Sequence, residues 1–152
     1  KQRLEKAASG RYIAPLFGQV VGREVCMNLP AEYAFDPDDI QSHAGMVANL
    51  RDYPDARIAQ AARAVIERSA VVLAAIIKGQ NADNFDERAV TTGILIEGTL
   101  FWKTDGYKER VEQQLRQLIP AHITPQFLHN DLAVQTNFIG VGYATLAMGN
   151  RV

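Results

Sequence analysis

Cysteine is nearly absent from this sequence, because Cys26 is the only one among 152 residues. A single cysteine excludes an internal disulfide and any zinc site built from several cysteines. We therefore expect the protein to work in a reducing compartment, for which the cytoplasm is the simplest assignment. No histidine or lysine stands near Cys26 in the sequence, so we expect a small core or half-buried thiol rather than a reactive one.

Charge of either sign is not in excess, with 16 Lys and Arg against 17 Asp and Glu and a formal net charge of −1. Proteins that bind nucleic acids usually carry a basic excess, so we expect no such partner. Long apolar runs are missing too. The longest, Ala70 to Ile77, is far shorter than the ~20 residues that cross a bilayer, and no signal segment opens the sequence. We expect a soluble protein without a membrane partner.

The length of the chain is that of one domain, residues 1–152. Folding at this length removes roughly 68–70% of the unfolded surface from water, which is enough for a core. The sequence begins at Lys1, without an initiating methionine and already inside a helix-like string, so we expect a fragment of a longer protein. It contains no internal repeat and no low-complexity tract.

Helical patterns dominate the first half, residues 1–79. We expect a helix over Gln2–Ser9 that ends at Gly10, because glycine adopts a left-handed cap without strain at Cβ. A second helix is expected to begin near Pro15. Proline is tolerated in a first turn, because the N–H that it lacks would have no partner there. Asn28–Phe35 is expected to be a connector. The apolar stripe of the second helix is Phe17, Val20, Val21 and Val25.

Carboxylates cluster directly after this connector, in the sequence Asp36, Pro37, Asp38 and Asp39. The cluster predicts a helix start, with Asp36 as N-cap and negative charge in the positive first turn. Such a cluster also suggests a metal site. Adjacent carboxylates in a first turn are usually solvated caps, so we favour the cap and expect no bound metal.

The three histidines, His43, His122 and His129, are far apart and lack the spacing of a metal or catalytic motif. We expect each to be solvated or hydrogen-bonded rather than a ligand or a base. No Walker A, Rossmann or nucleophile-elbow fingerprint is present either.

The clearest periodicity extends over Asp55–Lys78 and predicts a helix about 35 Å long that ends at Gly79. The polar segment that follows, residues 80–88, is expected to be a surface loop. The apolar residues that share the helical spacing are Ile58, Ala62, Val65, Ile66, Leu73, Ile76 and Ile77.

In the second half, residues 89–150, the spacing of apolar residues is no longer that of helices alone, and strands are expected as well. Val90–Ile96 suits a buried strand, and Asp105–Ile119 predicts a helix that ends at Pro120. The side chains expected to face inward from that helix are Tyr107, Val111, Leu115 and Leu118.

Ile123–Leu128 reads as another strand, in which Pro125 favours an edge or irregular position. Strand, helix and strand form one βαβ unit, so the two strands should be parallel and joined by a right-handed connection. A final helix is expected to begin near Thr136, with small residues at helical spacing. They are Gly140, Gly142, Ala144 and Ala147. The fold class is therefore α/β, with a partly parallel sheet packed by long helices.

The corner after the first strand is the candidate ligand site, since ligands of open α/β sheets gather beyond the carboxyl ends of strands. Gly98 would allow close approach, and Thr99 could offer its hydroxyl and N–H to a ribose or phosphate. Gly140 and Gly142 could open the last helix to an adenine. From the residues alone, a plain turn at Gly98 and tight helix packing at the glycine pair remain open alternatives.

Segments along the chain resemble eukaryotic-type hexokinases, in the order of that family. Leu4–Phe17 resembles the family's Phe-Glu-Lys-Met-x-Ser-Gly-x-Tyr-Leu-Gly-Glu segment, and Glu67–Gly79 resembles its long helix with Arg-Ala-Ala-x-Leu-x-Ala-Ala. Ile94–Glu109 is similar to Val-Asp-Gly-Ser/Thr-Leu-Tyr-Lys-x-x-Pro-x-Phe, on which the family holds adenosine. Ile139–Ala147 resembles Ser-Gly-x-Gly-Ala-Ala at the start of the terminal helix. The positions identical in the first segment are Glu5, Lys6, Ser9, Gly10 and Tyr12.

The resemblance implies the C-terminal part of a hexokinase large domain, with a ribonuclease H-like fold of the actin-like ATPase class. It also implies transfer of the ATP γ-phosphate to the 6-hydroxyl of a hexose such as glucose, with Mg²⁺ bound through the phosphates. Gly98 and Thr99 would pack against and hydrogen-bond the adenosine, and Gly140 and Gly142 would line that side of the nucleotide.

The sequence departs from the family pattern in two places near the nucleotide. Glu97 replaces the usual aspartate before Gly98. Pro37 and Asp38 stand where the family has a Thr-Lys pair after the phenylalanine, here Phe35.

The family's phosphate loops, catalytic aspartate and sugar-binding residues would all lie before Lys1. Phosphoryl transfer needs these groups for positioning and charge stabilisation. We therefore expect the chain alone to lack kinase activity and to bind ATP weakly, and its exposed apolar surface to favour self-association. The alternative is a non-catalytic actin-like module for nucleotide binding or association.

Overall fold

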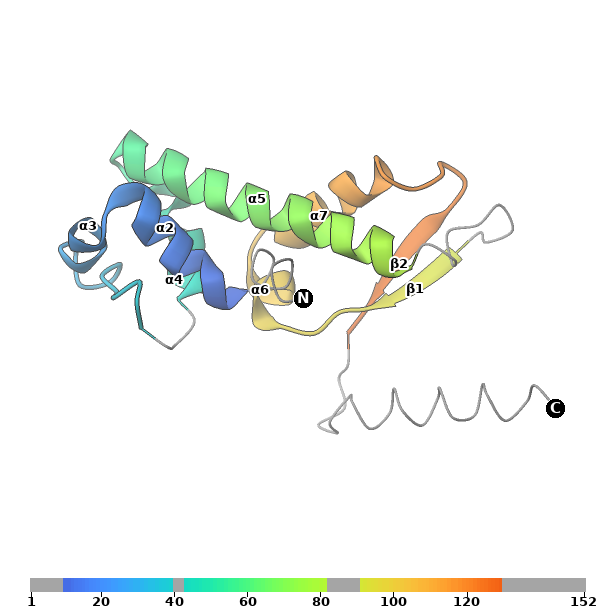
Figure 1. Ribbon diagram of the computed structural model, residues 1–152, viewed down its shortest axis with the longest axis horizontal. Helices are drawn as coiled ribbons and strands as arrows, with labels where there is room; N and C mark the ends of the chain where they lie inside the picture. Colours follow the sequence, from blue (N-terminus) through green and yellow to red (C-terminus); the bar gives the residue numbers. More distant parts are fainter. Residues whose placement is uncertain (1–9, 40–42, 82–90, 130–152) are drawn as a thin grey trace.

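The computed structural model describes residues 10–39, 43–81 and 91–129, which form a mixed α/β arrangement (Figure 1). The short 3₁₀ helices η1 and η2 cover Gly10–Tyr12 and Leu50–Asp52. The α-helices and strands are α2 (Ile13–Val21), α3 (Arg23–Met27), α4 (Ala44–Asn49), α5 (Ala56–Gln80), β1 (Thr91–Leu95), α6 (Thr99–Lys103), α7 (Tyr107–Arg116) and β2 (Thr124–Leu128). None of the described helices combines the length and apolar composition that crossing a bilayer requires.

The long helix α5 is the scaffold of the described residues, with α2, α3 and α4 beside its first half and the strands at its other end (Figure 1). Its 25 residues begin after Asp55, whose carboxylate accepts the backbone N–H of Arg57 at 2.8 Å. This N-cap satisfies one of the unpaired donors of the first turn. The predicted helix is confirmed.

The predicted end of this helix at Gly79 is wrong, because α5 continues to Gln80. Asn81 provides the cap instead. Its backbone N–H and its Nδ2 both donate to the carbonyl of Ile77, at 3.1 and 2.9 Å. An asparagine side chain that donates to a carbonyl of the last turn ends the helix here, as a left-handed glycine does in other helices.

The strands β1 and β2 pair in parallel, in register from Thr91 with Thr124 to Leu95 with Leu128. The predicted βαβ unit of parallel strands is therefore confirmed. Because the described sheet has only two strands, Pro125 lies on an edge strand, as its missing N–H favours.

The connection between the strands differs from the single predicted helix. It contains α6 and α7, separated where Gly106 has a φ of +69°. The last turn ends at Arg116, and Leu118 is 44% exposed whereas Ile119 is buried, so the inward position assigned to Leu118 is wrong. The helical period stops before Leu118, and the chain turns there instead of continuing the apolar stripe.

The helix α7 packs on α5 through side chains that were predicted to face inward, namely Tyr107, Val111 and Leu115, all at most 1% exposed. The Tyr107 hydroxyl forms a 2.7 Å hydrogen bond with the hydroxyl of Ser69 on α5. Burial raises the pKa of Tyr107, since the charged phenolate would lose its water. This contact joins the strand connection to the scaffold helix.

The second predicted helix is broken into α2 and α3 by Gly22, which has a φ of +100°. Phe17 is fully buried, but Val20 is 59% and Val25 is 39% exposed, so the predicted stripe is wrong at those positions. A left-handed residue changes the direction of the helix axis, and the period that linked Val25 to Phe17 does not continue across it. Cys26 on α3 is buried and its pKa is raised by desolvation, which confirms the expected core thiol.

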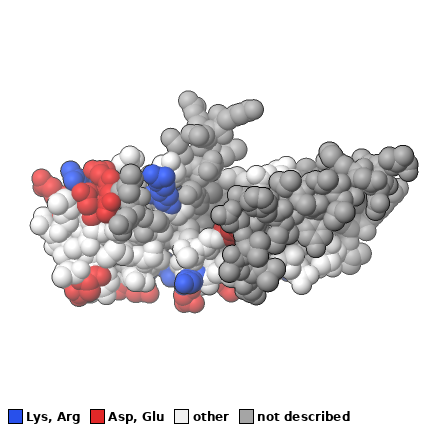
Figure 2. Space-filling view, turned by 90° about the horizontal axis from the view of Figure 1, so that it is seen from below, with Lys and Arg blue, Asp and Glu red and all other residues white. Residues whose placement is uncertain are grey.

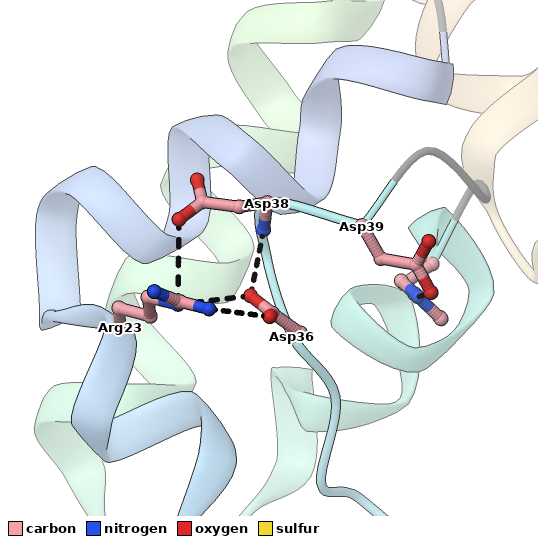
Figure 3. Close-up of polar contacts among 5 residues, drawn as sticks. Arg23, Asp36, Asp38 and Asp39 are labelled. Carbon is pink, nitrogen blue, oxygen red and sulfur yellow. Dashed lines mark hydrogen bonds and ion pairs between the residues drawn. The ribbon is translucent and has the colours of Figure 1, made fainter.

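No helix starts at Asp36 in the described residues, and that prediction is wrong. Figure 3 shows Arg23 reaching Asp36 and Asp38. Its guanidinium donates to both Asp36 oxygens, at 3.0 and 2.6 Å, and Asp36 also accepts the Asp38 backbone N–H at 3.0 Å. The carboxylate thus stabilises a turn, a conformation that competes with helix. The predicted helix over Gln2–Ser9 and the final helix lie outside the described residues, as does most of the predicted loop, from residue 82.

Candidate functional site

A cavity of about 570 Å³, here called the corner pocket, lies beside the corner that follows β1. It is lined from three places in the chain: η1, the α4 and η2 segment, and the start of the strand connection. The lining residues are Gly10 and Arg11; Ala44, Gly45, Ala48, Asn49 and Arg51; and Gly98, Thr99, Leu100, Lys103, Thr104 and Asp105. The predicted corner residues Gly98 and Thr99 are both among them.

Gly98 combines an unusual backbone conformation with open space. Its φ is +117°, which side chains of L-residues rarely adopt. A Cβ built on Gly98 would meet no atom within 4 Å. The backbone therefore requires glycine here even without a ligand, while the empty space beside it leaves room for one. None of the described residues fills this position.

Small residues on the opposite side of the pocket keep it open. Gly10 approaches Ala44 and Leu100, since a Cβ on Gly10 would lie 3.6 Å from the Cβ of each. A Cβ on Gly45 would meet nothing within 4 Å. Glycine and alanine at these positions let η1, α4 and α6 come close together without side chains that occupy the pocket.

Aromatic side chains of α6 hold this helix in place beside the corner. Phe101 is 3% exposed, and its ring lies edge-on to that of Phe127 on β2 at 5.0 Å between centroids. The indole Nε1 of Trp102 donates to the carbonyl of Ile96 at 2.9 Å. These contacts tie α6 to β2 and to Ile96, which directly follows β1, so the position of Thr99 is determined by the core.

Arg51 connects two sides of the pocket. Its Nε donates to the carbonyl of Ala48 at 2.7 Å, and its Nη1 donates to the carbonyl of Asp105 at 2.9 Å. Because Ala48 belongs to α4 and Asp105 follows α6, one guanidinium joins segments far apart in sequence. Both bonds end on neutral carbonyls, so they leave the positive charge of Arg51 in place.

The other predicted site residues are not brought to this pocket by the described structure. Gly140 and Gly142 lie outside the described residues. Pro37 and Asp38, at the family's Thr-Lys pair, do not line the corner pocket, and Asp38 instead pairs with Arg23 at 3.3 Å. Within the described ranges, no three His, Cys, Asp or Glu side chains gather where they could hold a metal ion.

The contacts of two histidines, His43 and His129, are given by the described structure. His43 Nε2 lies 3.4 Å from Asp39 Oδ2, and its ring stacks on Phe35 at 5.4 Å between centroids. His129 lies edge-on to Trp102 at 4.8 Å. Both rings have aromatic partners.

The sequence reasoning missed several lining residues, including Arg11, Gly45, Arg51 and Lys103. They belong to segments that only tertiary structure brings beside the corner. Gly10 carries a signal, because it is part of the Ser-Gly-x-Tyr resemblance, although the helical pattern predicts only a helix stop there.

Another cavity, of about 480 Å³, lies between α2, α3 and the first turns of α5. Apolar side chains dominate it, among them Val20, Val25 and Ile58, with Asp55 and Arg57 at its side. This cavity has no glycine like Gly98 on its lining, where open space replaces a side chain. It is therefore the weaker candidate for a nucleotide.

Comparison of the sequence with models of known protein families finds no match, and a search among curated proteins finds none either. The features of the chain that bear on its function are therefore the corner pocket and the residues that resemble the hexokinase segments.

Proposed function

We propose that this chain is the C-terminal, adenosine-binding portion of an ATP-dependent hexokinase with a ribonuclease H-like fold. The observation that carries the proposal is Gly98, which follows the carboxyl end of β1, borders the corner pocket and has open space in place of a side chain. Ligands of open α/β sheets bind beyond this end of the strands. The parallel strands and the long α5 are the elements that such a fold would share.

A further observation supports the proposal: two of the hexokinase-like segments meet at one cavity. Gly10 comes from Leu4–Phe17 and Gly98 from Ile94–Glu109, and both line the corner pocket. Both segments therefore contribute to one cavity, as a shared nucleotide site would require. The volume, about 570 Å³, also lies within the usual range of roughly 300–1,000 Å³ for small-molecule sites.

In this proposal the chain supplies half of the site. Gly98 admits the flat face of the nucleoside, and Thr99 offers its hydroxyl to the ribose. The groups that bind the hexose, the base that orients its 6-hydroxyl and the main phosphate loops are not among the family segments that this sequence resembles, so the proposal assigns them to another part of the kinase. Mg²⁺ would bind through the phosphates of ATP. The isolated chain should therefore bind ATP weakly and leave glucose unphosphorylated, and a single turnover of phosphorylation by it would contradict this division.

Replacing Gly98 by valine tests the proposal. The side chain would occupy the open space, so we expect ATP binding, measured by calorimetry at millimolar ATP, to weaken at least tenfold. Gly22→Val is the matched control, because Gly22 has a similar φ of +100° but lies away from the corner pocket. Both variants carry the same kind of backbone strain. Only Gly98→Val should lose ATP.

A substitution without backbone strain gives an independent check. Thr99→Val removes the hydroxyl at an exposed position, and the loss of one hydrogen bond should weaken ATP binding roughly fivefold. Equal affinity in wild type, Gly98→Val and Thr99→Val would contradict the proposed adenosine site.

The alternative is a non-catalytic association module of the actin-like class. It is favoured by the outer face of the sheet, where the paired residues Leu95 and Leu128 are 53% and 43% exposed. Truncation of a larger domain would expose the same face, so self-association is expected under either proposal. Nucleotide binding at Gly98 separates the two.

A further inference from the structure

We propose that the outer edge of β1 is an interaction surface, at which a second copy of this chain adds its own β1 so that two copies share one continuous sheet. The surface, here called the β1 edge, consists of the backbone groups that point away from β2. This inference goes beyond nucleotide binding, because residues 91–95 do not line the corner pocket. It also replaces a general contact between apolar faces with a defined pairing of strands.

The direction of the hydrogen bonds in the sheet defines the β1 edge. The N–H of Ile96 donates to the carbonyl of Leu128 at 3.1 Å. Because backbone groups alternate in direction along a strand, the even-numbered residues of β1 face β2. Thr91, Gly93 and Leu95 therefore direct their N–H and C=O groups to the other side. Among the described residues, β1 pairs with β2 alone, so the β1 edge is left without a strand partner there.

The outer edge of β2 is less suited to pairing. Leu128 faces β1, so Pro125 and Phe127 direct their backbone groups outward, and proline has no N–H to donate.

The strand β1 contains none of the residues that prevent edge pairing. Its sequence, Thr-Thr-Gly-Ile-Leu, has neither proline nor charge, which are the usual protections of an edge strand. On the face that Figure 2 shows, the charged side chains of the described residues gather over the helical part, and the described surface toward the strand end is free of them. Nothing in β1 therefore opposes the approach of another strand.

A second copy fits the β1 edge because the edge is complementary to itself. In an antiparallel pair with a two-fold axis at Gly93, this residue lies opposite its counterpart, and Thr91 of each copy lies opposite Leu95 of the other. Each residue of the edge then both donates and accepts, so one contact completes the edges of both copies. Two-fold dimers, in which both subunits use the same surface, are the commonest oligomers.

The side chains on the outer face of the sheet favour the same pairing. Leu95 and Leu128 are 53% and 43% exposed. Leu128 lies over Gly93, since a Cβ built on Gly93 would be 3.2 Å from its Cδ1. Diagonal neighbours in an antiparallel pair are within reach of long side chains, so Leu95 of the second copy meets Leu128 above Gly93. Pairing at the edge thus removes both leucines from water.

Sedimentation equilibrium of the full chain over a range of protein concentrations tests the inference. We expect a reversible equilibrium between monomer and dimer. Leu95→Pro removes an N–H of the β1 edge, and Leu95→Ala is the matched control that loses the apolar side chain but keeps the N–H. The proline variant should dimerise at least tenfold more weakly than the alanine variant, because backbone hydrogen bonds are lost.

Amide hydrogen exchange of the wild-type chain gives a second measurement that needs no variant. The N–H groups of Gly93 and Leu95 should exchange more slowly as the protein concentration rises, whereas that of Phe127, at the outer edge of β2, should not change. A monomer at all concentrations, open-ended assemblies, equal dimerisation of the two variants, or exchange at Gly93 that does not depend on concentration would overturn the inference. ATP binding by a monomer would keep the nucleotide site and overturn only the dimer.

Discussion

Gly18 and Gly98 lack a side chain for different physical reasons. Gly18 is buried on α2, where a Cβ would lie 2.6 Å from Cβ and Cγ of Pro37. Gly98 is exposed, with a positive φ and open space. The first glycine allows two segments to touch, and the second leaves open space among the described residues. Sequence alone indicates Gly98, which follows a strand, but gives no sign of the contact between Gly18 and Pro37.

Replacing Gly18 by alanine should destabilise the protein by about 1–3 kcal/mol, the usual cost of overpacking. The added methyl group would overlap Pro37, whose ring has little freedom to move. Gly79→Ala is the matched control, since a Cβ there meets nothing within 4 Å and Gly79 lies within α5. It should stabilise by roughly 0.5–1 kcal/mol. Urea unfolding measures both, and a Gly18→Ala variant as stable as wild type would contradict the contact.

The hydroxyls of Ser69 and Tyr107 form a buried polar contact between α5 and α7, and both residues are at most 2% exposed. Ser69→Ala removes the partner of a buried phenol, which should cost about 1–3 kcal/mol of unfolding free energy. In the Ser69→Ala, Tyr107→Phe double variant no phenol is left without a partner, so the two losses should not add. Additive losses in the urea midpoints would show that the pair makes no direct contribution.

Elements were predictable where the apolar pattern is continuous. The period of α5 and the alternation of β1 follow directly from burial on one side of a helix or strand, and the parallel pairing of β1 with β2 follows from the helical connection. The errors fall where a single residue changes the backbone. Gly22 divides α2 from α3, Gly106 divides α6 from α7, and Asp36 forms a turn with Arg23 instead of a helix cap.

The turn at Asp36, which precedes α4, should make the stability of the protein depend on pH in the acid range. Hydrogen bonds from Arg23 hold the pKa of Asp36 below its usual value of about 3.9, with a smaller contribution from the Asp38 backbone N–H. A lowered pKa in the folded state means that this contribution to stability is complete above about pH 4 and is lost as the pH falls through the folded pKa. Arg23→Gln removes the main cause of the shift.

Urea midpoints at about pH 6 and pH 2 measure this effect. Asp36→Asn and Arg23→Gln should be less stable than wild type at the higher pH, and the difference should shrink as the pH falls and the carboxyl becomes protonated. A difference between variant and wild type that stays constant with pH would contradict the ion pair as its cause.

At the scale of the whole molecule, the corner pocket is a product of tertiary structure. The sequence identified Gly98 and Thr99, because a glycine after a strand is a local feature, and the family resemblance supplied the nucleoside. It did not identify Arg11, Gly45 or Lys103, since their roles depend on how η1 and α4 lie against α6. When a pocket is lined by separate segments, its residues have no fixed interval along the chain, so no sequence motif reveals them.

The central claim is that an adenine nucleotide lies against Gly98, and backbone amide shifts during ATP titration test it most directly. The claim predicts progressive, saturable shifts at Gly98, Thr99 and Gly10, which line one pocket, and none at Val20 or Val25 beside the other cavity. Amide signals at Gly98 and Thr99 that stay unmoved at millimolar ATP would contradict it.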